Sequence, residues 1–123
     1  MTSSSDRRRL MRVQLDTPIT AKLAASRVVL VDISPEGARI EHTFPLYRGK
    51  TVSLSFTAGS LHVAVACTVV RCKIEKHDDK VAYFSGLKFL AIQDGSLDAL
   101  RSMITAAVER DFEARQQLTV NVL

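Results

Sequence analysis

The 123-residue sequence contains no tryptophan, and only 6% of its residues are aromatic. Barrels that bind single-stranded nucleic acid stack bases on exposed aromatic rings, so this composition argues against that class. Long apolar runs are also absent, which argues against a membrane-spanning helix. The polar first six residues do not resemble a secretion signal. The chain is therefore expected to reside in the cytoplasm.

Cysteine and histidine are scarce, with two and three residues respectively. Cys67 and Cys72 lie five positions apart on a predicted strand, which would place them on opposite faces and disfavours a disulfide. The histidines do not have the spacing of a zinc site. No arrangement of serine, histidine and aspartate supports nucleophilic catalysis. The sequence thus predicts a protein that is not an enzyme and that carries no cofactor or metal.

The positive charge of the chain is concentrated at its start. Residues 1–12 contain four arginines and one aspartate, a local charge of +3 out of a net +4, which leaves +1 for the other 111 residues. A protein that binds duplex nucleic acid usually carries a broad basic face, so no duplex partner is expected. Because residues 1–12 have few apolar side chains to bury, we predict a flexible arginine-rich arm.

The rest of the chain has the pattern of a small β-barrel followed by a helix. Apolar residues alternate with polar ones in six segments separated by turn signals. Apolar residues then recur at helical spacing from Leu97 to Phe112. The predicted fold class is mainly β, a six-stranded antiparallel barrel with a C-terminal helix. We expect one domain, with the arm at 1–12, the barrel at 13–92 and the helix at 94–118. The predicted strands are 13–23, 28–33, 38–42, 51–56, 61–69 with a continuation as far as 74, and 81–90.

Two arginines in the arm form an Arg-x-x-x-Arg motif, Arg8 and Arg12. A guanidinium group pairs bidentately with phosphate oxygens and with O6 and N7 of guanine. Residues four apart share a face when the chain forms a helical turn, so the two side chains are able to act on one ligand. A solubilising basic tail is the alternative interpretation.

A second motif, Asp-x-Ser-x-x-Gly, follows an apolar strand and comprises Asp32, Ser34 and Gly37. A carboxylate at Asp32 can accept two hydrogen bonds from the N1–H and N2–H edge of guanine. The Ser34 hydroxyl can bond a phosphate or a base edge, and Gly37 lets the backbone approach a ligand. The alternative is a β-turn stabilised by its own aspartate and serine.

Together the two motifs resemble the PilZ domain family, the bacterial receptor module for cyclic di-GMP. The family pattern places Arg-x-x-x-Arg one strand hairpin before Asp/Asn-x-Ser-x-x-Gly, as this sequence does. A third segment, Gly86-Leu87-Lys88-Phe89, resembles the Gly-aliphatic-x-Phe of the last barrel strand of the family. The order of the predicted strands and the C-terminal helix agree as well, so the resemblance covers nearly the whole chain.

The resemblance implies a role for each matched residue. Arg8 and Arg12 would clamp the phosphates and guanine bases of cyclic di-GMP. Asp32 and Ser34 would read a guanine edge on the barrel, and Gly37 would keep the turn open. These roles describe a receptor without catalytic activity.

Arg7 adds an implication about stoichiometry. It matches the position at which PilZ domains with arginine hold an intercalated dimer of cyclic di-GMP. The resemblance also implies that the arm becomes ordered on ligand binding and relays the signal to an effector protein. Two alternatives remain: a PilZ-like protein-interaction barrel that binds no ligand, and a small OB-like barrel that binds nucleic acid.

Overall fold

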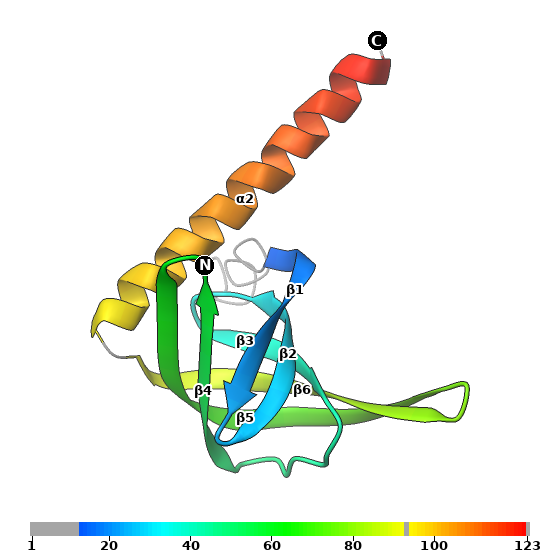
Figure 1. Cartoon of the computed structure of the whole chain (residues 1–123), viewed down its shortest axis with the longest axis vertical. Coiled ribbons are helices and arrows are strands. Elements are labelled where there is room, and N and C mark those ends of the chain that lie inside the picture. The colour runs from blue at the N-terminus through cyan, green and yellow to red at the C-terminus, as the bar shows by residue number, and fades with distance from the viewer. Residues whose placement is uncertain (1–12, 93, 123) are drawn as a thin grey trace, which may run out of the picture.

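The computed structural model describes residues 13–92 and 94–122. Six antiparallel strands form a closed barrel in the order β1-β2-β3-β6-β5-β4, and helix α2 follows them (Figure 1). The predicted fold class is confirmed. The predicted flexible arm at 1–12 lies outside the described residues. The elements are β1 Val13–Leu23, β2 Ser26–Ile33, β3 Gly37–His42, β4 Thr51–Ala58, β5 Leu61–His77, β6 Lys80–Ile92 and α2 Asp94–Val122.

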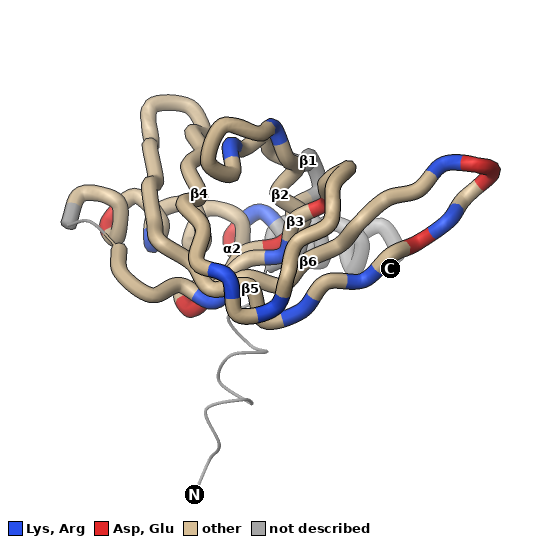
Figure 2. Tube along the Cα trace, turned by 90° about the horizontal axis from the view of Figure 1, so that it is seen from below, with Lys and Arg blue, Asp and Glu red and all other residues tan. Residues whose placement is uncertain are grey.

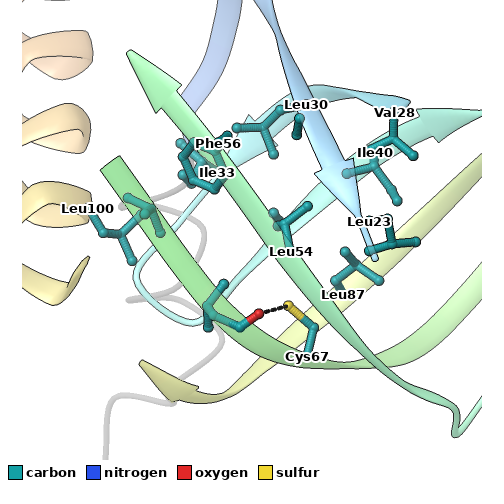
Figure 3. Packing of buried hydrophobic residues seen from close by; sticks show 14 of the residues in the cluster. Leu23, Val28, Leu30, Ile33, Ile40, Leu54, Phe56, Cys67, Leu87 and Leu100 are labelled. Atoms are coloured by element: carbon teal, nitrogen blue, oxygen red, sulfur yellow. Dashed lines mark hydrogen bonds between the residues drawn. The ribbon is translucent and has the colours of Figure 1, made fainter. Parts of the chain in front are cut away.

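Alternate residues of every strand face the interior of the barrel and form one apolar core (Figure 3). Leu30, Ile40 and Leu54 are completely buried there. Cys67 belongs to the same core, and its thiol contacts the Val65 carbonyl oxygen at 3.8 Å. Burial raises the pKa of Cys67 to about 12, so its thiol stays protonated at neutral pH.

The prediction that Cys67 and Cys72 lie on opposite faces is wrong. The pairing of β5 with β6 shifts register between Val69 and Arg71, so Val70 is an extra residue in β5. A β-bulge of this kind reverses the alternation of the side chains that follow it. Cys72 consequently packs against the core that contains Cys67, and both cysteines are free thiols.

Helix α2 packs mainly on β5, crosses one end of the barrel and continues beyond it (Figure 1). It extends to Val122, past the predicted end at 118, because no glycine or proline after Gly95 interrupts it. Leu100 and Ile104 are buried as predicted, whereas Val108 is 46% exposed. The Ser96 hydroxyl accepts a 2.8 Å hydrogen bond from the Ala64 N–H and so anchors α2 to β5. Within the described residues no helix has the length and apolarity to cross a membrane.

His42 is a buried polar residue with two hydrogen bonds. Its Nδ1–H donates to the Phe44 carbonyl at 2.6 Å, so Nε2 accepts a hydrogen bond from the Ser85 hydroxyl at 2.7 Å. The ring also stacks on Tyr83, with 5.7 Å between the centroids. Desolvation lowers the pKa of His42 below 6.5, partly opposed by its bond to Phe44. The fold therefore holds the neutral imidazole.

His42 is expected to make the fold less stable in mild acid. Since its pKa is lowered in the folded protein, the unfolded chain binds the proton more readily, and stability is lost as the pH falls below 6.5. Urea unfolding at about pH 7.5 and about pH 5 measures this effect. His42→Gln should reduce the difference between the two conditions, and His62→Gln, at an exposed position, should leave it unchanged. The same pH dependence in wild type and His42→Gln would contradict the assignment.

Candidate functional site

Ser34 closes the turn that joins β2 and β3. Its side chain is 1% exposed, and its Oγ lies 3.1 Å from the Gly37 N and 3.3 Å from the Glu36 N, both of which donate to it. The Ser34 hydroxyl also reaches the Gly37 carbonyl at 3.2 Å, and the Ser34 N–H donates to that carbonyl at 2.9 Å. The hydroxyl thus serves the turn in this structure, and it holds the backbone beside Asp32 in a fixed shape.

Gly37 allows β3 to approach β6 closely. A Cβ atom at Gly37 would collide with the backbone carbonyl oxygen of Leu87. The Phe89 N–H donates to the Glu36 carbonyl at 2.8 Å, which ties the turn to the same strand. Gly37 thus accommodates the neighbouring strand β6, and its expected role beside a ligand stays a prediction.

A β-bulge directs Asp32 to the outer face of the barrel. Leu30 pairs with Ile40 and Asp32 pairs with Arg39, so Val31 is an extra residue in β2. Without this bulge Asp32 would share the inward face of Val28 and Leu30. Directly opposed residues in a sheet share a face, so Asp32 lies on the face of Arg39.

Asp32 and Arg39 form an ion pair, with 3.0 Å between Asp32 Oδ2 and Arg39 Nε. The Asp32 side chain is 4% exposed and that of Arg39 is 45% exposed. Because the Arg39 side chain is about half exposed, the pair contributes little to folding, but it orients the Asp32 carboxylate.

Arg39 was not among the site residues predicted from the sequence. The turn from Ser34 to Gly37 sets the register of the hairpin, and counting outward from its two ends pairs Asp32 with Arg39. The signal was therefore present in the motif, but using it required the register of the hairpin and not only the order of the strands.

A second arginine lies on the same outer face. Gly86 of β6 is opposite Arg39 on one side and opposite Arg71 of β5 on the other. Adjacent strands are about 4.8 Å apart, so the two arginine Cα atoms are separated by roughly 10 Å across a residue without a side chain. Asp32, Arg39, Gly86 and Arg71 thus form an outer row across β2, β3, β6 and β5. The row combines a carboxylate, two guanidinium groups and, at Gly86, backbone without a side chain, which suits a planar anionic ligand.

The start of β1 lies next to this row. Val13 pairs with Ile33 and Gln14 pairs with Asp32, so the chain enters the barrel beside the β2–β3 turn. The predicted site residues Arg7, Arg8 and Arg12 lie outside the described residues. The structure brings the other three together in one hairpin, with Ser34 and Gly37 at the two ends of its turn and Asp32 just before the turn on β2.

An apolar cavity of about 470 Å³ lies between the end of the barrel and α2. Its lining is mostly aliphatic, with Glu109 and Arg110 as its charged members, so it does not suit a phosphate-bearing ligand. The lining includes Leu15, Ile19, Leu30, Ile33, Leu61 and Met103. No group of three or more histidine, cysteine or acidic residues in the described part of the chain is arranged to hold a metal.

The closed barrel, its charged outer row and its polar turn define a small binding module. The PilZ domain family model matches residues 6–106, and the chain belongs to this family. PilZ domains are receptor or adaptor modules and not enzymes. No curated protein sequence matches the chain.

Solved structures share the fold. The PilZ domain of Escherichia coli YcgR with c-di-GMP has a TM-score of 0.64 at 18% identity, over 88% of this chain and 94% of that chain. The Bacillus subtilis inhibitor of motility MotI/DgrA has a TM-score of 0.64 at 15% identity, over 83% of this chain and 50% of that chain. Borreliella burgdorferi PlzA in complex with c-di-GMP has a TM-score of 0.53 at 10% identity, over 94% of this chain and 51% of that chain. The chain thus spans about half the length of MotI and PlzA.

Proposed function

We propose that this protein is a cyclic di-GMP receptor that relays the ligand signal to an effector protein. The observation that carries the proposal is the juxtaposition of Asp32, held by Arg39 on the outer face, with the point at which the arginine-bearing segment enters the barrel. Membership of the PilZ family and the similarity in fold to two c-di-GMP complexes support it.

Each residue of the site has a role in the proposal. Asp32 accepts hydrogen bonds from the N1–H and N2–H groups of a guanine, with its carboxylate oriented by Arg39. Ser34 and Gly37 fix the turn on which the base is read. Arg8 and Arg12 bind phosphate oxygens and a guanine base, since a guanidinium group suits both.

The arm supplies the proposed signal. Residues 1–12 carry four arginines and little apolar surface, so the phosphates of a ligand would supply most of the interactions that order them. When Arg8 and Arg12 bind the ligand on the barrel, the arm and the ligand together form a new surface. The effector protein would recognise that surface.

Calorimetric titration with cyclic di-GMP tests the proposal, because it reports affinity and stoichiometry together. Amide hydrogen exchange of residues 3–12, with and without the ligand, tests the ordering step. The proposal expects saturable binding and slower exchange in the arm on binding. An Asp32→Ala variant should bind much more weakly, and a heat signal that Asp32→Ala leaves unchanged would overturn the proposed site.

Arg7 is expected to control the number of bound ligands. A second cyclic di-GMP stacked on the first adds two phosphates, and a cation beside them offsets the repulsion. Wild-type protein should therefore take up two ligands per chain and Arg7→Leu one, with Asp32-dependent binding retained. Titration of both proteins to saturation measures the two ratios. One ligand per chain in the wild type, or the same ratio in both proteins, would contradict this role.

A further inference from the structure

The hairpin of β5 and β6 projects well beyond the barrel (Figure 1). In the described part of the chain, β4 pairs with β5 up to Thr68, and the Gly49–Lys50 loop bonds Val69. β3 pairs with β6 only up to Tyr83, which is opposite His42. Segment 70–77 of β5 therefore has one unpaired edge, and 75–77 with 80–82 forms a ribbon of two strands.

Such a ribbon is weakly stabilised by itself, because two strands have no further sheet or core to pack on. The hairpin nevertheless carries apolar side chains in solvent at and next to this ribbon: Ile74 is 62% exposed and Val81 is 44% exposed. Ile74 is opposite Tyr83, and Val81 is opposite Lys76, so Ile74, Tyr83 and Val81 share one face of the hairpin. An unpaired edge next to an exposed apolar face is a typical site for strand addition.

The charges on this edge complement a second copy of the same edge. Lys73 and Glu75 flank Ile74, and their opposite residues on β6 are Phe84 and Ala82, which carry no charge. In an antiparallel pair of two β5 edges with the twofold axis at Ile74, each Lys73 is opposite the Glu75 of the other copy. Directly opposed unlike charges stabilise such a pair. Figure 2 shows basic and acidic residues following one another along this hairpin.

Neighbouring registers are disfavoured. An axis at Lys73 would place two lysines opposite each other, and an axis at Glu75 would place two glutamates opposite each other. A twofold axis midway between Lys73 and Ile74 would place Arg71 opposite Lys76. An axis midway between Ile74 and Glu75 would place Lys73 opposite Lys76. The register with its axis at Ile74 avoids facing like charges and brings the two exposed isoleucines into contact.

We propose that the β5 edge from Val70 to His77 is a homodimer interface that joins two hairpins into one antiparallel sheet of four strands, β6-β5-β5-β6. On one face of this sheet, Tyr83 and Ile74 of each copy form a continuous apolar row across the interface. On the other face, Lys73 of each copy pairs with Glu75 of its partner. Arg71 belongs both to this edge and to the outer row beside Asp32, whereas Lys73, Ile74 and Glu75, which carry the pairing, lie further along the hairpin toward its tip. The interface requires no bound ligand.

Sedimentation velocity over a range of protein concentrations, without cyclic di-GMP, tests the interface. Lys73→Glu and Glu75→Lys should each weaken the dimer by about tenfold or more, because each creates two pairs of facing like charges. The double variant Lys73→Glu/Glu75→Lys should restore the wild-type affinity to within about threefold, because it exchanges the charges and keeps the pairing. Ile74→Lys should abolish the dimer.

Lys80→Glu is the matched control, since it reverses an exposed charge on β6 of the same hairpin. It should leave the dimer unchanged, and circular dichroism should show that every variant is folded. A monomer at all concentrations would overturn the proposal. So would a dimer that tolerates the single charge reversals, or one that the double variant fails to restore. None of these outcomes depends on whether the protein binds cyclic di-GMP.

Discussion

Replacing Arg8 or Arg12 with alanine is expected to weaken the binding of cyclic di-GMP by about 10- to 150-fold, while Arg9→Ala weakens it by no more than about threefold. Each motif arginine would lose charge-assisted hydrogen bonds that contribute about 1.5–3 kcal/mol. All three substitutions remove one positive charge from the same arm. The difference between them therefore separates specific contacts from general electrostatic attraction.

Titration calorimetry of the three variants at one salt concentration measures this difference. Their free energies of unfolding should stay within about 0.5 kcal/mol of the wild type, because the arginine-rich segment has few apolar side chains to bury and surface substitutions rarely change stability further. Equal losses of affinity in all three variants would mean that the arm acts only through its net charge. The site would then consist of the barrel residues alone.

Replacing Gly37 with alanine is expected to lower the free energy of unfolding by about 1–3 kcal/mol, the usual cost of an added group in a packed interior. The new methyl group would meet the Leu87 backbone carbonyl, which cannot move aside as a flexible side chain can. β3 and β6 would have to separate at this point, and the turn that carries Ser34 would shift with them. Urea unfolding measures the loss.

Two other glycines provide controls for Gly37→Ala. Gly86 lies on the strand next to Gly37, and a Cβ there would meet Val70 Cγ2 at an ordinary 3.5 Å. Gly95, in the first turn of α2, has open space around the equivalent position. Gly86→Ala and Gly95→Ala should therefore cost much less stability than Gly37→Ala. If Gly37→Ala is as stable as Gly86→Ala but fails to bind cyclic di-GMP, the glycine serves the ligand and the packing explanation is wrong.

The two predictions address different parts of one site. The arginine variants test the segment that joins the barrel at Val13. The Gly37 variant tests the β2–β3 turn, which lies beside the point where that segment joins the barrel. Loss of binding with unchanged stability is expected in the first case. Loss of stability is expected in the second, with binding reduced through displacement of the turn and of Asp32.

The sequence by itself determined the class of fold and the position of the turn. Alternation with a period of two predicted the strands, because one face of each strand must be buried, and a shift to helical spacing predicted α2. Pro18 cannot donate a backbone hydrogen bond, and the pairing of β1 with β2 shifts register between Gln14 and Ile19, the interval that contains it. The motif Asp32–Gly37 was placed correctly at the end of a strand.

The tertiary structure alone decided how the site is built. The bulges at Val31 and Val70 reverse side-chain direction, so they place Asp32 on the outer face and Cys72 against the core. Such bulges depend on pairing between strands, which alternation within one strand does not record. The partnership of Arg39 with Asp32 and the close approach of Leu87 to Gly37 likewise join residues on different strands. Local pattern therefore fixed which segments form the barrel, and contacts between strands fixed which side chains meet.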